Sequence, residues 1–215
     1  MTVGESYTLY KLVLKFSGFT TAQESNVVIG STVQLRCPDK SNSQTWIIWS
    51  KKVGDRFITY SEATNIDPGL DQDLKSRLQV TGDQTAGEYH LNISDVRKSD
   101  EGTYKCLIIG TSGGSTQQLT VIIGPTSVYI GNVTPYNKIL GIEGQDMTIN
   151  CTAVGGQPAP DIKLVILGSI YAGLGLAQHT FTPHSSDDGS TVTCQAGYNQ
   201  INFNPLSTSA YIHLM

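Results

Sequence analysis

The sequence predicts an all-β protein made of two β-sandwiches in tandem. The chain has 215 residues, enough for two domains of about 100 residues that each bury their own core. Val, Ile, Thr and Tyr recur in short runs between glycine-rich turns, and no long amphipathic helical stretch occurs. The four cysteines are divided evenly between the two halves, and an alternating apolar run leads into the first cysteine of each half.

Alternation of apolar and polar residues locates the strands of the first half. Residues 30–37 alternate strictly and predict a strand with one apolar face. Residues 45–50 predict the next core strand, in which Trp49 faces one way while Trp46 and Ile48 face the other. Further strands are predicted at residues 56–60, 76–80, 87–93 and 103–109.

The second half begins in the same way. Residues 144–151 match residues 30–37 position by position, and both runs end in a cysteine. Between the halves, Gly124 and Pro125 are predicted to break the strand and to form a tight junction, because proline cannot donate a hydrogen bond to a sheet. We therefore predict two domains, residues 1–123, including an N-terminal extension, and residues 124–215.

Several function classes lack support in the sequence. The formal charge of −4 is mild and spread along the chain, whereas nucleic-acid binding needs a clustered basic face, so no nucleic-acid partner is expected. The C-x-x-C spacing that is typical of zinc sites does not occur. The four histidines are scattered, and no nucleophile with a base and an orienting partner can be identified. We expect neither an enzyme nor a bound metal or cofactor.

The first half carries a set of motif residues at family-specific spacing. They are Cys37, Trp49, Arg77, Asp100, Tyr104 and Cys106. On these residues, the region from about residue 12 to residue 123 resembles an immunoglobulin V-set domain. The resemblance implies a disulfide between Cys37 and Cys106 with Trp49 packed on it, an ion pair between Arg77 and Asp100, and a Tyr104 hydroxyl bonded to nearby backbone. The strand after the second cysteine is similar to the joining segment of antigen receptors.

Residues 125–215 resemble an immunoglobulin C2-set domain, with Cys151 and Cys194 as the implied disulfide. The tryptophan of the family is absent, and Leu164 or Val165 is expected in its place. The 43 residues between the cysteines, against 69 in the first half, predict a smaller sandwich without V-set C′ and C″ strands. A V-set domain followed by a C2-set domain is similar to nectin-like and junctional adhesion ectodomains and to the VJ–C2 molecules of amphioxus.

The resemblance implies an extracellular protein, either secreted or a cell-surface ectodomain. Disulfides persist in oxidising compartments, and each would stabilise its domain by roughly 4 kcal/mol. The sequence contains neither an apolar run of signal-peptide length near Met1 nor a run long enough to span a bilayer. We expect that Met1 is an artificial start and that a signal peptide, with or without a membrane anchor, has been removed.

The leading functional hypothesis is a recognition or adhesion receptor that binds a protein partner, favouring a second copy of itself, through the C–C′–F–G face of the V-set domain. Alternation predicts several apolar side chains on this solvent face. Lys51, Lys52 and Arg56 are expected around them. The candidate partner-binding residues are Trp46, Ile48, Phe57, Ile58, Lys105, Leu107 and Ile109, with the choice between Phe57 and Ile58 left open.

The alternative hypothesis is a secreted innate-immune protein that binds microbial surface carbohydrate or lipid through V-domain loops. The polar residues 39–44 would supply hydrogen bonds in this case. Candidate glycosylation sites are Asn92 and Asn132, each in an Asn-x-Ser/Thr motif. Asn92 is expected to point outward on the sheet opposite the candidate binding face, which would leave that face free.

Overall fold

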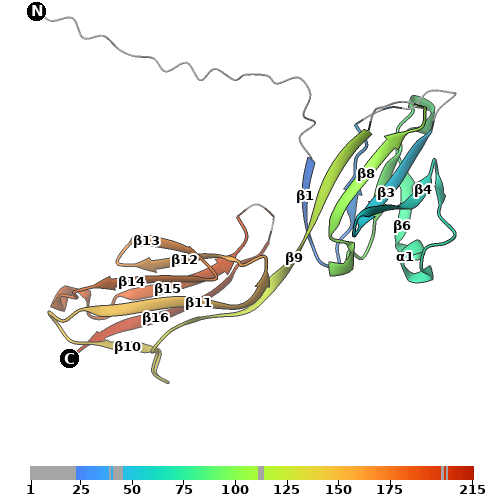
Figure 1. Ribbon diagram of the computed structural model, residues 1–215. Helices are drawn as coiled ribbons and strands as arrows, with labels where there is room; N and C mark the ends of the chain where they lie inside the picture. The colour runs from blue at the N-terminus through green and yellow to red at the C-terminus, as the bar shows by residue number, and fades with distance from the viewer. Residues whose placement is uncertain (1–22, 39, 41–45, 111–113, 200, 202) are drawn as a thin grey trace, which may run out of the picture.

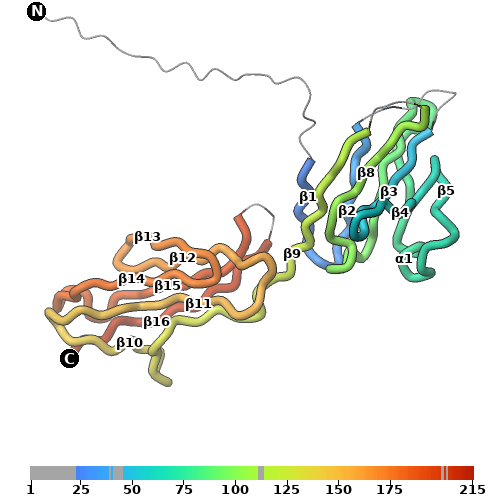
Figure 2. Tube along the Cα trace, in the orientation of Figure 1, coloured from blue at the N-terminus to red at the C-terminus, as the bar shows by residue number. Residues whose placement is uncertain are grey.

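The computed structural model describes residues 23–38, 40, 46–110, 114–199, 201 and 203–215. Figure 1 shows two β-sandwiches joined end to end, and Figure 2 follows the same path along the Cα trace. The prediction of an all-β protein with two tandem sandwiches is confirmed. Each sandwich has its own apolar core, centred on Trp49 in the first and on Leu164 in the second.

The first sandwich packs a three-stranded sheet, in the order β2-β7-β6, against a larger sheet in which β9, β8, β3, β4 and β5 follow one another. Strand β1 runs parallel to β9. The elements are β1 (Gln23–Val28), β2 (Val33–Leu35), β3 (Ile47–Val53), β4 (Arg56–Glu62), β5 (Asn65–Ile66), α1 (Gln72–Arg77), β6 (Leu78–Thr81), β7 (His90–Ile93), β8 (Gly102–Ile108) and β9 (Gly114–Ile130).

Helix α1 occupies part of a segment for which the alternation predicted only strand. The side chain of Asp71 accepts a hydrogen bond from the backbone N–H of Asp73 and so caps the helix. The helix continues to Arg77, and the strand begins one residue later, at Leu78. Local capping therefore shortens the strand predicted at residues 76–80.

Strand β9 contradicts the predicted break at the junction. It runs for 17 residues through Gly124 and Pro125 and pairs first with β8 and then with β11 (Met147–Gln157). Pro125 lies opposite Gly155, where the register of the β9–β11 ladder shifts. A bulge of this kind accommodates a residue that cannot donate to the ladder, so proline does not end the strand here.

The second sandwich packs β9 and its neighbours β11 and β14 against a five-stranded sheet in the order β10-β16-β15-β12-β13. Leu164 is fully buried opposite Cys194 and takes the position of the missing tryptophan. The remaining elements are β10 (Lys138–Gly141), β12 (Asp161–Ile166), β13 (Ser169–Leu174), β14 (Leu176–Phe181), β15 (Thr191–Gly197) and β16 (Leu206–Leu214).

Strand β13 corrects the expectation that the short cysteine spacing leaves no room for a C′ strand. It pairs with β12 along the full length of both strands. The turn between them has only two residues, Leu167 and Gly168, with φ of 50° and 79°. Two positive φ values are typical of the type I′ turn, which connects a hairpin with the fewest residues. The extra strand therefore fits within the 43-residue spacing.

Candidate functional site

Strands β3, β4, β8 and β9 form the C–C′–F–G face, which is the side of the larger sheet that faces away from the first core. Ile48 on β3 lies opposite Leu107 on β8, and Ser50 lies opposite Lys105. Trp49, between Ile48 and Ser50, is fully buried. Because neighbouring side chains on a strand point to opposite faces, these two pairs point outward.

An apolar cluster occupies one end of this face. Trp46 is 47% exposed, while Ile48 and Leu107 are half-buried beside it. The backbone N–H of Ile109 donates to the carbonyl oxygen of Trp46 at 3.0 Å, so Ile109 continues the β3–β8 pairing beyond the end of β8. A shallow hollow of about 300 Å³ adjoins the cluster and is lined by Trp46, Glu62, Ala63 and Asn65.

The register of β4 decides whether Phe57 or Ile58 joins the face. Phe57 lies opposite Lys52, and Ile58 lies opposite the buried Lys51. Phe57 is therefore on the outward side, where the Lys105 ammonium lies 5.9 Å from the centre of its ring. Ile58 is 43% exposed but points to the opposite side of the sheet, so the structure does not bring it to the candidate face.

The charges around the face differ from the expected ring of three basic residues. Lys52 and Arg56 are exposed near Phe57. Lys51 instead points inward, where its ammonium donates to the carbonyl oxygen of Ser99, and burial lowers the pKa of Lys51. At the other end of the face, Glu62 is exposed opposite Ile48. The face is thus basic at one end and acidic at the other.

A buried polar network fixes the base of the first sandwich. The Arg77 guanidinium donates to both oxygens of the Asp100 carboxylate, at 2.7 and 3.2 Å. These hydrogen bonds raise the pKa of Arg77. The Tyr104 hydroxyl donates to the carbonyl oxygen of Asp100 at 2.7 Å, and the Trp49 indole donates to that of Tyr89 at 2.9 Å. The network holds β8, and with it the outward residues of that strand.

The disulfide pairs are those that the resemblance implies. Cys37 is bonded to Cys106 and Cys151 to Cys194, with Cα–Cα distances of 5.8 and 5.6 Å. This confirms the prediction that each sandwich closes its own pair.

The glycosylation acceptors lie away from the candidate face. Asn92 is on β7, in the opposite sheet, and its side-chain oxygen accepts a hydrogen bond from the Thr81 hydroxyl at 3.3 Å. Asn132 is exposed in a turn, with a φ of 58°. Modification at either position stays a prediction. The alternative loop site at residues 39–44 lies outside the described residues except for Lys40, and the microbial-ligand hypothesis stays untested.

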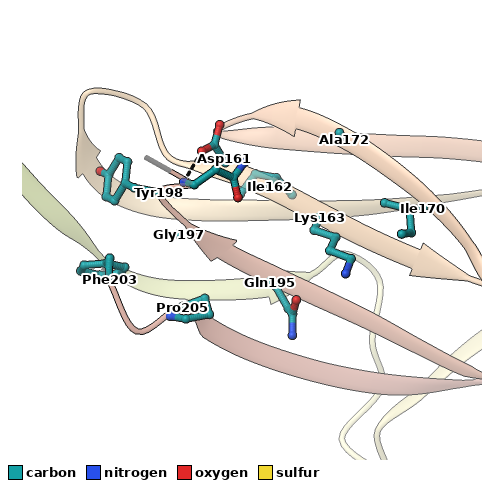
Figure 3. Close-up of a pocket in the computed structure, with 11 residues that line it drawn as sticks. Asp161, Ile162, Lys163, Ile170, Ala172, Gln195, Gly197, Tyr198, Phe203 and Pro205 are labelled. Atoms are coloured by element: carbon teal, nitrogen blue, oxygen red, sulfur yellow. Dashed lines mark hydrogen bonds between the residues drawn. The ribbon is translucent and has the colours of Figure 1, made fainter. Parts of the chain in front are cut away.

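A groove in the second sandwich was not predicted from the sequence. It has a volume of about 420 Å³ and lies on the outer side of β12, β13 and β15 (Figure 3). Its walls combine the exposed Lys163 and Ile170 with Tyr198 and Phe203, whose rings meet edge to face at 5.4 Å. The alternation in β12 indicates which side chains point outward, but the hollow also depends on where Tyr198 and Phe203, which follow β15 in sequence, are placed.

In the described part of the chain, no group of three His, Cys, Asp or Glu side chains is placed to hold a metal ion. Likewise, none of the helices formed by the described residues is long and apolar enough to cross a membrane.

Comparison with known proteins places this architecture in a family. Two disulfide-closed sandwiches with a Trp49-centred first core define an immunoglobulin-type protein. Residues 20–122 match the family model described as immunoglobulin V-set domain. The first sandwich therefore belongs to the immunoglobulin superfamily as a V-set domain.

The chain is similar to larger proteins of this superfamily. It is 27% identical to nephrin of Homo sapiens over 198 residues, which cover 83% of this chain and 15% of nephrin. It is 25% identical to cell adhesion molecule 3 of Rattus norvegicus over 206 residues, covering 89% of this chain and 49% of that protein. The chain therefore spans about half or less of the length of these two relatives.

A solved structure shows the same fold. The CD2-binding domain of CD58 superimposes with a TM-score of 0.56 at 16% identity, covering 88% of this chain and 96% of that structure. At this identity the likeness extends to the fold alone.

Proposed function

We propose that this protein is an extracellular recognition and adhesion module that binds a protein partner through the C–C′–F–G face, and that the partner is a second copy of the chain. The observation that carries the proposal is the apolar cluster of Trp46, Ile48 and Leu107 on the solvent side of the sheet. Clusters of this kind on sheet faces mark protein–protein interfaces. The similarity to cell adhesion molecule 3 supports an adhesive role, and the two disulfides favour an oxidising, extracellular location.

The distribution of charge supports self-pairing. Glu62 lies at the Trp46 end of the face, while Lys52 and Lys105 lie at the Phe57 end. Along β3, Ile48 and Lys52 are about 13 Å apart at the usual rise of a strand. A two-fold axis that lies in the interface, perpendicular to the strands, would therefore place the acidic end of each copy against the basic end of the other, with the apolar cluster of one copy against Phe57 of its partner.

Substitution of the apolar cluster tests the proposal. In Ile48→Asp or Leu107→Asp, an apolar contact of the interface is replaced by a carboxylate that must be desolvated, and this cost exceeds its attraction to the exposed Lys52 of the other copy. We therefore expect self-association to weaken at least about 30-fold, as for a hot-spot residue. Sedimentation velocity over a concentration series measures this effect. Thermal melting of each variant checks that the domain is still folded.

The matched control is Gln79→Asp, which adds the same charge to an exposed position on the opposite sheet. This variant should associate like the unchanged protein. A second check mixes Lys52→Glu with Glu62→Lys, since opposite charges then meet again across the two-fold axis. A monomer at every concentration, or equal behaviour of Ile48→Asp and Gln79→Asp, would reject pairing through this face.

A further inference from the structure

The free edge of the second sandwich is formed by β13. This strand is last in the order β10-β16-β15-β12-β13, and among the described residues no strand pairs with its other side. In Figure 1 it lies at the outer margin of the sandwich. An edge strand presents backbone N–H and C=O groups that another strand can bind.

Edge strands are usually protected, and β13 has none of the usual protective features. Its sequence contains no charged residue and no proline. Ile170 is 60% exposed and Leu174 is 70% exposed. By comparison, β10 begins with a lysine, and β14 exposes Gln178 and Thr180. Uncharged, apolar strands of about six residues readily pair with one another when they are exposed.

Contacts on the core side of the sandwich hold β13 in place. The ring of Tyr171 stacks on that of His179 in β14, with 3.7 Å between ring centres. The tight turn at Leu167 and Gly168 holds the other end of the strand against β12. An edge that is already ordered loses little conformational entropy when a partner binds it.

We infer that β13 is a strand-addition site for β13 of a second copy of this chain, joined antiparallel with Ala172 facing Ala172. Ile170, Ala172 and Leu174 all point outward, since Tyr171 between them lies opposite the buried Leu164. In this register Ile170 of each copy faces Leu174 of the other, so every outward pair is apolar. The same side chains border the groove in Figure 3, where Ile170 and Ala172 form one wall.

The self-complementary register distinguishes a second copy from other partners. Because the strand is apolar at both ends and small in the middle, it matches its own reverse, whereas a charged peptide would place unpaired charges against Ile170 and Leu174. This surface is separate from the C–C′–F–G face and does not depend on the function proposed for that face.

Cysteine cross-linking tests the register. Facing residues of antiparallel strands have Cα atoms about 4.5–5.5 Å apart, a distance that a disulfide can bridge. Under mild oxidation, Ala172→Cys should therefore form a covalent homodimer. A mixture of Ile170→Cys and Leu174→Cys should form mixed dimers at least ten times faster than either variant alone. All variants carry Ile48→Asp, so association through the C–C′–F–G face does not contribute.

The control is Lys163→Cys, which lies on the same side of the sheet but one strand further in, opposite Ala172. Thermal melting confirms that each variant is folded, and the native Cys151 and Cys194 are fully buried in their own disulfide. A Leu174→Lys substitution should abolish cross-linking through Ala172→Cys. No cross-link at Ala172, an equal yield from Lys163→Cys, or an Ile170→Cys homodimer as abundant as the mixed dimer would overturn the inference.

Discussion

Replacement of Asp100 by alanine is expected to lower the free energy of unfolding of the V-set domain by about 3–5 kcal/mol. The Asp100 side chain is 3% exposed and that of Arg77 is 8% exposed, so the variant would keep a buried guanidinium with the half-exposed carboxylate of Asp73, 3.6 Å away, as its remaining counter-charge. The loss is large because a buried charge pays the full cost of desolvation when its partner is removed.

The carboxylate of Asp100 also organises the surrounding backbone. One of its oxygens accepts from the backbone N–H of Arg97 at 2.8 Å, in addition to the guanidinium of Arg77. The same guanidinium donates to the carbonyl oxygens of Ser94 and Asp95, at 3.3 and 3.2 Å. A single substitution therefore removes the acceptor of the Arg97 N–H and of the Arg77 Nη2 as well as a bond to Nη1, and the effect exceeds that of one hydrogen bond.

Tryptophan fluorescence during urea unfolding measures this effect in the V-set domain alone, because both tryptophans of the chain, Trp46 and Trp49, belong to it. The control is Arg97→Ala, which removes an ion pair with Asp73 that is 2.6 Å long but about half exposed. We expect this loss to stay below about 1 kcal/mol. Equal losses of stability in Asp100→Ala and Arg97→Ala would show that the buried network does not stabilise the domain more than an exposed ion pair does.

The fold class could be predicted because it depends on short-range patterns. The period of two in β3 places Trp49 and Trp46 on opposite faces, and the structure agrees, with Trp49 fully buried and Trp46 exposed. The resemblance to immunoglobulin domains likewise implied the pairs Cys37–Cys106 and Cys151–Cys194, which the structure contains. Neither the alternation nor the disulfides required us to predict the order of strands in the sheets; the family pattern was enough.

The composition of the candidate face could be predicted only in part, because it depends on register. The β3–β4 ladder shifts between Trp49 and Ser50, and this bulge decides that Phe57 rather than Ile58 points outward. Lys51 points inward toward Ser99 for a different reason: it lies two residues after the buried Trp49 on β3, so alternation within that strand already places both on the core side. A bulge arises from pairing between strands, so alternation within one strand does not reveal it.

Long-range pairing also explains why the structure differs from the predicted strand break at Pro125 and from the predicted absence of a C′ strand in the second sandwich. Pro125 was expected to end a strand, but the irregular pairing of β11 at Gly155 accommodates it. The cysteine spacing was expected to exclude the strand that became β13, but a two-residue turn leaves enough chain for it. In both cases a local rule was overridden by the geometry of the neighbouring strand.

Removal of the V-set disulfide, in the double variant Cys37→Ala/Cys106→Ala, is expected to cost about 4 kcal/mol of stability. The bridge closes a 69-residue separation, and the chain entropy that it removes from the unfolded state accounts for most of this amount. Trp49 lies opposite Cys106 in the β3–β8 pair, so fluorescence-detected urea unfolding reports on the affected core directly.

The matched variant Cys151→Ala/Cys194→Ala removes a bridge with a 43-residue separation, whose entropic contribution is also about 4 kcal/mol. Strand β9 links the two cores, because it buries Val121 in the first and Ile130 in the second. Loss of the second bridge is therefore expected to reach the tryptophans through this strand. Because each core is closed by its own bridge, we expect the tryptophan-detected midpoint to move far less in this variant than in Cys37→Ala/Cys106→Ala. Equal shifts would contradict this expectation and would mean that the shared strand makes the two sandwiches unfold as one unit.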